Sequence, residues 1–324
     1  MRSLRPIIAA LAALSLAVLV AACGDQGGGG GAPPAGGGAN ANAIQKVPGA
    51  ETKGEITVGS KNFTEQYVLG EVYAQALEAA GFKVKKQLDL GSEQIAFKAL
   101  KGGQIDGYPE YTGTSLTSFF DVKTEDVPKE AQPAYEQTKA AFAKEDITAL
   151  APTPFENTYR LGALKETADR LGGVKNTSQL APKSKELSVT AYPECAQRDD
   201  CALGVKRAYE LDFEDTVESE TPYDILDAKE ADIAFLFTTD AKLTLPKYAI
   251  FEDDKKFFPP YNVSFGIRND ALKKIGPAGQ KVIEQVQAPL TVEVMRELNS
   301  RVDIDKQEPE QVARDYLKEE GFTK

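Results

Sequence analysis

Four aromatic residues lie at the ends of predicted strands or in turns, and together they could bind a cation. They are Tyr111 in "YPEYTGT", Tyr159 in "ENTYRL", Phe237 in "LFTTD" and Tyr261 in "KFFPPYNVS". Several ring faces around one point attract a desolvated cation by about 0.5–2 kcal/mol per ring. A quaternary ammonium cannot donate hydrogen bonds, so rings suit it better than a carboxylate pocket. Core packing is the alternative for each ring taken singly.

The segment "YPEYTGT" is unusual as a core strand because it carries proline between two tyrosines. Proline removes a donor from a ladder, so we expect strand pairing to end at Pro109. Tyr111 would then present its ring to a cleft, Gly113 would make the turn and Thr114 would border a ligand. We expect Tyr108 to serve only in packing.

The composition excludes several classes of function. The 324 residues include 38 Lys and Arg against 49 Asp and Glu, which gives a net charge of -11, and there is no His. An acidic chain lacks the basic surface that nucleic acid requires. The absence of His removes Ser-His-Asp and Cys-His catalysis and most catalytic zinc sites. No G-x-S-x-G or GK[ST] motif is present, so we expect no enzyme, no cofactor and no metal.

The N-terminal segment has the form of an export signal. Residues 1–22 carry a basic start, the apolar run "IIAALAALSLAVLV" and small residues before Cys23. A simple secretory signal or a membrane anchor is the alternative. Cysteine directly after "VAA" resembles a bacterial lipobox, which implies cleavage before Cys23 and its lipidation. The protein would then be anchored by lipid outside the cytoplasmic membrane, in the periplasm or on the outer face.

Residues 23–53 are rich in glycine and have no apolar periodicity, which predicts a flexible tether. A coil of about 30 residues spans roughly 30 Å, enough for a folded body to reach a membrane partner. The two remaining cysteines, Cys195 and Cys201, form an even pair in an exported chain. We expect a disulfide between them, and metal binding is the alternative.

The body from residue 54 to 324 is long enough for two α/β domains. Its first part alternates predicted strands and helices in a β-α-β-α-β order, which predicts a largely parallel sheet. Residues 155–251 repeat this kind of order. Asp106 precedes Tyr111 by five residues and Asp232 precedes Phe237 by five, each after a short helix. This repetition suggests that two equivalent domains offer strand ends to one cleft.

Several motifs taken together resemble the substrate-binding proteins of osmoprotectant ABC importers, which handle glycine betaine, carnitine, choline and proline betaine. They are "ITVGSKNFTEQYVLGEVYAQALE", "YPEYTGT", "PTPFENTYRL", "DDKKFFPPYNVSFGIR" and the C-terminal "MRELNSRVD…EPEQVARDYLKEEGF". The resemblance covers residues 54–324. It implies a two-domain, type II-like periplasmic-binding-protein fold, with residues 54–155 and 258–324 in one domain and 156–257 in the other. It also implies delivery of ligand to a membrane permease, and we expect a monomer.

The resemblance assigns the cage of rings to Tyr111, Tyr159, Tyr261 and the position of Phe237. Asn157 would lend a backbone carbonyl near the methylated nitrogen. The family commonly has Tyr where this chain has Phe237, so the ring face is kept and the hydroxyl is lost.

The resemblance also implies polar anchors for the other end of the ligand, at Lys61, Thr114 and Arg198. Arg198 is the weaker match because Cys195 and Asp200 replace the Phe and Gly of the family pattern. A solvated surface charge is the alternative for Lys61 and Arg198. Both cations are expected to point into a closed cleft, where a ligand carboxylate would pair with them and choline would leave them unpaired and desolvated. We therefore predict a betaine-type zwitterion over choline as the ligand.

Other functions stay open at this point. A ligand-sensing lipoprotein without a transport role and a binder of another methylated cation, such as a trimethylated histidine betaine, would use the same cage. A secreted hydrolase is the interpretation from a different class, and the composition disfavours it. Tyr192 could face the cleft beside Arg198, whereas Tyr135 is expected in core or surface packing.

Overall fold

The computed structural model describes residues 42–324. The predicted signal peptide, Cys23 and the tether up to residue 41 lie outside the described residues. Within residues 42–324, no helix combines the length and the apolar character needed to cross a membrane.

Two five-stranded sheets form the body, in the orders β2-β1-β3-β10-β4 and β7-β6-β8-β5-β9. The strands are β1 (Glu55–Gly59), β2 (Lys83–Gln87), β3 (Gly107–Tyr111), β4 (Ile147–Glu156), β5 (Tyr159–Leu164), β6 (Ser188–Ala191), β7 (Asp215–Glu218), β8 (Ile233–Phe237), β9 (Tyr248–Ile250) and β10 (Asn262–Arg268). The three strands β2-β1-β3 correspond to β7-β6-β8, and both sets are parallel. The other two strands of each sheet are antiparallel, so the predicted largely parallel sheets are in fact mixed.

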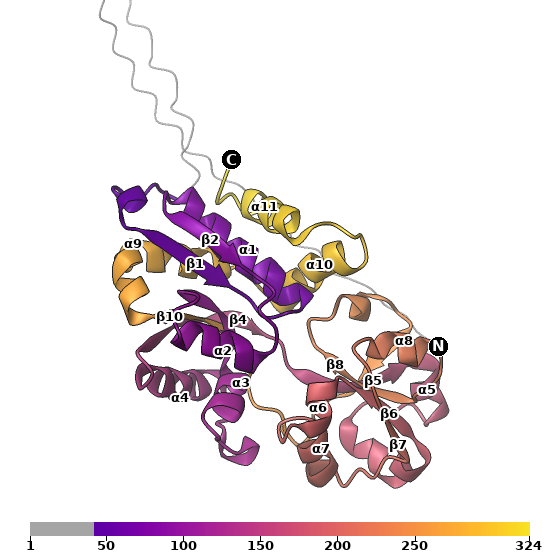
Figure 1. Ribbon diagram of the computed structural model, residues 1–324. Coiled ribbons are helices and arrows are strands. Elements are labelled where there is room, and N and C mark those ends of the chain that lie inside the picture. The colour runs from indigo at the N-terminus through magenta and orange to yellow at the C-terminus, as the bar shows by residue number, and fades with distance from the viewer. Residues whose placement is uncertain (1–41) are drawn as a thin grey trace, which may run out of the picture. The chain divides into compact units, whose positions relative to one another are not determined.

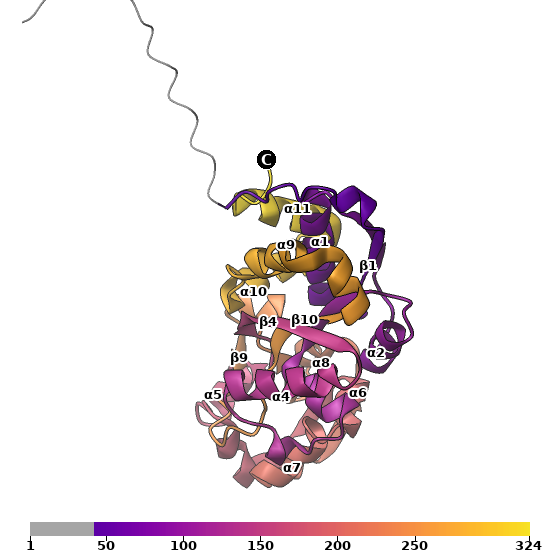
Figure 2. The same ribbon diagram turned by 90° about the vertical axis from the view of Figure 1, so that its left-hand side faces the viewer.

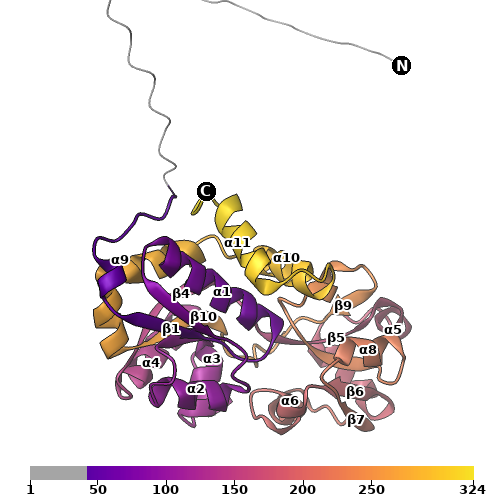
Figure 3. The same cartoon turned by 45° about the horizontal axis from the view of Figure 1, so that its top comes forward.

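Helices cover both faces of each sheet (Figure 1). They are α1 (Thr64–Ala79), α2 (Glu93–Lys101), α3 (Thr112–Thr114), α4 (Ala131–Ala143), α5 (Lys165–Arg170), α6 (Pro193–Gln197), α7 (Ala202–Tyr209), α8 (Pro222–Asp227), α9 (Asn269–Gln287), α10 (Val292–Asp303) and α11 (Pro309–Glu319). Figure 2 shows α9 and α11 on one side of β4 and β10, and α4 on the other. Figure 3 shows α5 and α8 beside the second sheet.

Helix α1 lies in the main core because one face of it is apolar. Val68, Val72 and Ala76 recur at four-residue spacing and are fully buried. The helix ends at a glycine with a left-handed backbone, Gly81 at φ 102°. The amide of Phe82 donates to the carbonyl of Leu77, which closes the last turn in a Schellman motif.

The predicted equivalence of Asp106 and Asp232 is present in the structure. The Asp106 carboxylate accepts from the amide of Thr57 on β1, and Asp232 accepts from the amide of Ser188 on β6. Each aspartate also pairs with an arginine, Arg268 at 2.7 Å and Arg170 at 2.5 Å. The same device therefore fixes the start of β3 and of β8, whose far ends carry Tyr111 and Phe237.

The expectation that strand pairing ends at Pro109 is wrong. Pro109 lies in the middle of β3 and is in register with Phe265 of β10. The other neighbour, β1, pairs with β3 only at Gly107. Proline is tolerated because β1 no longer needs a donor at this point.

The packed body begins before the predicted start at residue 54. Ile44 donates its amide to Phe322, Val47 donates to Ala80, and Ala50 is fully buried. The strands of the first sheet lie in residues 55–156 and 262–268, and those of the second in 159–250. The chain thus passes between the sheets twice, and the exact division at 155/156 and 257/258 stays a prediction.

We expect Asp106→Ala to lower the free energy of unfolding by about 3 kcal/mol, because it leaves the partly buried Arg268 paired only with the exposed Asp270. The matched change Asp232→Ala removes a more exposed pair, with Arg170 61% exposed, and should cost about 1 kcal/mol. Urea denaturation followed by circular dichroism measures both. Equal losses would contradict this ranking.

Candidate functional site

A cavity of about 370 Å³ lies where the two sheets' strand ends meet. All eight residues predicted to bind ligand line it: Lys61, Tyr111, Thr114, Asn157, Tyr159, Arg198, Phe237 and Tyr261. Residues separated by up to 200 positions are thus brought together around one space. Ligands bind at such strand ends in open α/β sheets.

Strand ends and crossing segments position the aromatic residues. Tyr111 is the last residue of β3, and Phe237 is the last residue of β8. Tyr159 begins β5 and Tyr261 precedes β10, so both follow a passage of the chain between sheets. The amide of Asn157 donates to the carbonyl of Tyr261 at 3.1 Å, which ties the two passages together.

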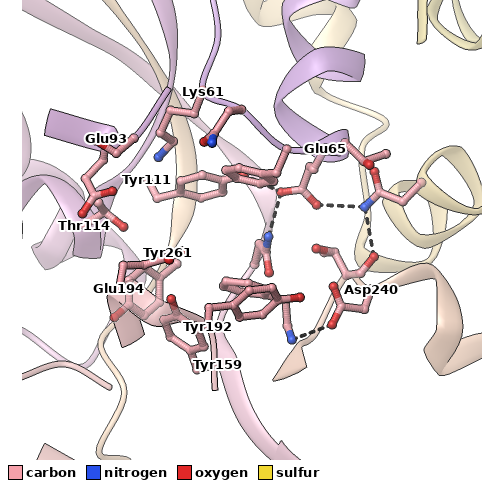
Figure 4. A pocket seen from close by; sticks show the side chains of 18 of the residues that line it. Lys61, Glu65, Glu93, Tyr111, Thr114, Tyr159, Tyr192, Glu194, Asp240 and Tyr261 are labelled. Carbon is pink, nitrogen blue, oxygen red and sulfur yellow. Dashed lines mark hydrogen bonds between the residues drawn. The ribbon is translucent and has the colours of Figure 1, made fainter. Parts of the chain in front are cut away.

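The rings form two groups on opposite sides of the cavity. Tyr159 lies 4.4 Å from Phe237 and 6.3 Å from Tyr261 between ring centroids, and Tyr192 lies 5.3 Å from Phe237. Figure 4 shows Tyr111 across the cavity from Tyr159 and Tyr192. Tyr192, which the sequence left open, thus lines the cavity. Tyr135 is a core residue that donates to the carbonyl of Ala149.

Gly113 is required by close approach rather than by a turn. A Cβ at Gly113 would lie 2.8 Å from ring atoms of Tyr261 and 2.9 Å from the carbonyl oxygen of Pro260. The two segments that carry Tyr111 and Tyr261 can therefore touch only where one of them has no side chain.

Lys61 is buried and already paired. Its Nζ lies 2.5 Å from Oε1 of Glu110. The same carboxylate accepts from the hydroxyl of Tyr108 and the amide of Tyr111. Tyr108 therefore does more than pack, since it helps to fix the counter-ion of Lys61.

Arg198 is also paired within its own loop. Its Nε and Nη2 donate to the two carboxylate oxygens of Asp200 at 2.7 and 2.6 Å. Burial alone would raise the pKa of Asp200, but Arg198 and two further hydrogen-bond donors, Tyr261 and Thr117, hold it below its usual value. A disulfide joins Cys195 and Cys201 around this loop. The premise that both cations stay unpaired without a ligand carboxylate is wrong.

Two carboxylates that the sequence did not single out face each other at one end of the cavity (Figure 4). Glu65, in the first turn of α1, is 2% exposed and accepts from Tyr111, Asn157 and Asn299. Burial raises the pKa of Glu65 although these donors, with Thr239, oppose the rise.

Asp240 follows β8 and lies on the other side of this end. Its Oδ2 accepts from the amide of Phe237 at 2.8 Å and from the hydroxyl of Tyr223 at 2.9 Å. Burial, with smaller contributions from the negative charges of Glu65 and Asp303, raises the pKa of Asp240 to about 7.

Both carboxylates had a signal in the sequence. Glu65 lies four residues after Lys61 in "GSKNFTEQ", and Asp240 closes the turn "LFTTD" directly after a predicted strand. Glu93, Glu194 and Glu220 line the cavity as well. Glu194 follows Tyr192 in "YPEC", whereas Glu93 and Glu220 are brought to the cavity by the tertiary fold alone.

Comparison with known proteins gives a family match over most of the body. The family "substrate binding domain of ABC-type glycine betaine transport system" matches residues 54–319. A Pseudomonas aeruginosa glycine-betaine-binding protein is 31% identical over 278 residues, covering 82% of this chain and 87% of its own.

Two further proteins match this chain, one in sequence and one in structure, and the ligands in their names differ. A Helicobacter pylori ergothioneine transport permease and binding protein is 30% identical over 285 residues, covering 87% of this chain, which spans about half the length of that protein (49%). The crystal structure of a glycine betaine/carnitine/choline ABC transporter protein matches with a TM-score of 0.69 and 27% identity, covering 82% of this chain and 98% of the other.

We expect the ligand-free protein to lose stability as pH rises from about 4 to 7, in part because of Asp240. Its pKa is about 7 in the folded state and 3.8 ordinarily, so in this window the folded protein holds a proton that the unfolded chain releases. The destabilisation by Asp240 is complete above about pH 7, where the folded protein carries the charge, shrinks as the pH falls through this window and is gone below about pH 4. Glu65 contributes in the same direction, and Asp303, Tyr223 and Tyr192 are further titratable groups near Asp240.

The measurement is the melting temperature of the wild type and of Asp240→Asn from pH 4.5 to 8.5. Asparagine keeps the acceptor for Phe237 and Tyr223 and does not titrate. The melting temperature of the variant should rise relative to that of the wild type as the pH increases. A difference in melting temperature that is constant across this range would contradict the raised pKa of Asp240.

Proposed function

The chain belongs to the family of substrate-binding domains of ABC-type glycine betaine transport systems, and on this premise we propose that it captures a quaternary-ammonium osmoprotectant in its aromatic pocket. Ligands of this class include betaines, carnitine and choline. The captured ligand would be delivered to the permease of an ABC transporter. The protein would act outside the cytoplasm, where such binding proteins meet their ligands.

One observation carries the proposal: rings from both sheets line a single cavity. Tyr111 comes from the first sheet, and Tyr159 and Phe237 come from the second. A trimethylammonium group between them would meet ring faces on two sides, each attracting the charge without a hydrogen bond. Closure of the two lobes around the ligand would complete the cage.

The polar residues of the pocket have separate roles in this proposal. Thr114 offers a hydroxyl at the end of the cavity that holds Lys61 and Arg198. Asn157 is held in place by the hydrogen bond that its Nδ2 donates to Glu65 at 3.0 Å. The loss of a hydroxyl at Phe237 leaves the ring group intact, because the Phe237 ring packs against Tyr159 and Tyr192 in tilted contacts.

The membrane attachment of the proposal rests on the N-terminal sequence. A lipid on Cys23 and the glycine-rich segment after it would keep the body near the membrane and within reach of a permease. The named relatives are binding and transport proteins of glycine betaine, carnitine and ergothioneine, so these three compounds and choline form the ligand panel.

Tyr159→Ala should weaken the binding of each quaternary-ammonium ligand by about 2- to 30-fold, the cost of one ring face. Isothermal titration calorimetry gives the affinity, and circular dichroism checks that the ligand-free variant is folded. Tyr67→Ala is the matched control, since Tyr67 lies on α1 outside the cavity and bonds Asp89. Unchanged binding by Tyr159→Ala would place the cage elsewhere.

Cys23→Ser should move the protein from the membrane fraction to the soluble fraction when the full chain is expressed in a bacterial host. The substitution removes the thiol that would carry the lipid and keeps the size of the side chain. Detergent phase partitioning and mass spectrometry of the N-terminus provide the measurement. Retention of the variant in the membrane would show that another segment anchors the protein.

A further inference from the structure

Glu65 differs from the other buried carboxylates of the described chain in having no cation beside it. The other four each form an ion pair within 3 Å: Glu71 with Lys86, Asp106 with Arg268, Glu110 with Lys61 and Asp200 with Arg198. Only hydroxyl and amide donors surround Glu65 within residues 42–324. A buried charge without an opposite charge is costly, so its retention next to a cavity requires an explanation.

Two amide oxygens beside Glu65 are left without a donor. Asn157 and Asn299, which are 6% and 4% exposed, both direct their Nδ2 atoms to Glu65. Their Oδ1 atoms are buried and have no hydrogen-bond partner. Because Glu65 accepts only, it fixes both amides in this orientation and leaves two unpartnered acceptors in residues that line the cavity.

Asp240 adds a second charge at the same end from the other lobe. Its Oδ2 accepts from the amide of Phe237 and from the hydroxyl of Tyr223, and both donors are neutral. Glu65 from α1 and Asp240 from the turn after β8 thus face each other across the cavity with no cation between them (Figure 4). This end presents negative charge and acceptors from both lobes.

The opposite end of the cavity is not positive. Lys61 is neutralised by Glu110 and Arg198 by Asp200, whereas Glu93 and Glu194 add further carboxylates there. Oε1 of Glu93 lies 3.7 Å from Nη1 of Arg198 and neutralises its charge further. A ligand carboxylate placed at this end would meet like charges, which costs several kcal/mol when they are close.

We infer that Glu65 and Asp240 are the counter-ions of the ligand's cationic group, and that the pocket selects organic cations without a carboxylate over zwitterionic betaines. The inference rests on the proposed function and narrows its ligand class. It reverses the preference that unpaired Lys61 and Arg198 would impose. A choline-type ligand would place its quaternary ammonium between the two carboxylates and its hydroxyl toward the opposite end.

The arrangement also links charge to closure. Glu65 and Asp240 come from different lobes, so without a cation they repel each other across the cavity. A cation bound between them turns this repulsion into two attractions. A neutral or zwitterionic ligand removes less of the repulsion and should close the lobes less completely.

Calorimetry with choline and glycine betaine tests the inference, because both carry a trimethylammonium group and only betaine carries a carboxylate. The wild type should bind choline about tenfold or more tightly than glycine betaine. Asp240→Asn should weaken choline about tenfold and glycine betaine by less than about threefold, because the betaine carboxylate is repelled by the charge that the variant removes. Asparagine retains both bonds to Oδ2, so the fold should persist.

Glu194→Gln tests the opposite end independently, since the exposed Glu194 lines the cavity and its removal should narrow the preference for choline. Glu136→Gln, an exposed change on α4, is the control that should alter neither affinity. Tighter binding of glycine betaine than choline, or an unchanged ratio in Asp240→Asn, would overturn the inference and leave the proposed function standing. Failure to bind any compound of the quaternary-ammonium panel would overturn both.

Discussion

The buried charge of Glu65 constrains the pocket more than any other single group. Its oxygens accept from Tyr111 at the end of β3, from Asn157 between β4 and β5, and from Asn299 on α10. These three donors come from segments far apart in the sequence, and each is oriented by its need to reach one carboxylate. The ring of Tyr111 is thereby fixed at both ends, by its strand and by its hydroxyl.

The two sheets explain how such distant segments meet. Each sheet repeats the parallel order of three strands, and each begins its third strand at an aspartate bonded to a neighbouring strand and to an arginine. The strand that follows ends five residues later at Tyr111 or Phe237. Because the same aspartate interactions fix the start of both strands and the strands have the same length, each strand ends with one ring at the same cavity.

The sequence predicted the positions of the rings well because strand ends are local features. Tyr111, Tyr159, Phe237 and Tyr261 all follow from turn residues and alternation close to them. Pairing was harder to predict: Glu110 is in "YPEY" and Asp200 is in "QRDD", yet neither motif indicates that these side chains neutralise Lys61 and Arg198. Residues 42–53 were assigned to the tether because they lack periodicity, and they pack on the body through backbone bonds that composition does not reveal.

The loop closed by Cys195 and Cys201 shows how a departure from the family pattern can preserve the pocket. Arg198 binds Asp200 with two parallel hydrogen bonds, and Asp200 in turn accepts from Tyr261 at 2.7 Å and from Thr117 at 2.9 Å. Arg198 therefore acts on the aromatic lining of the cavity through Asp200, which fixes the hydroxyl of Tyr261. Asp200 already neutralises the charge of Arg198. Arg198 therefore gives no reason to expect a carboxylate on the ligand, and the carboxylates that line the cavity are its dominant charge.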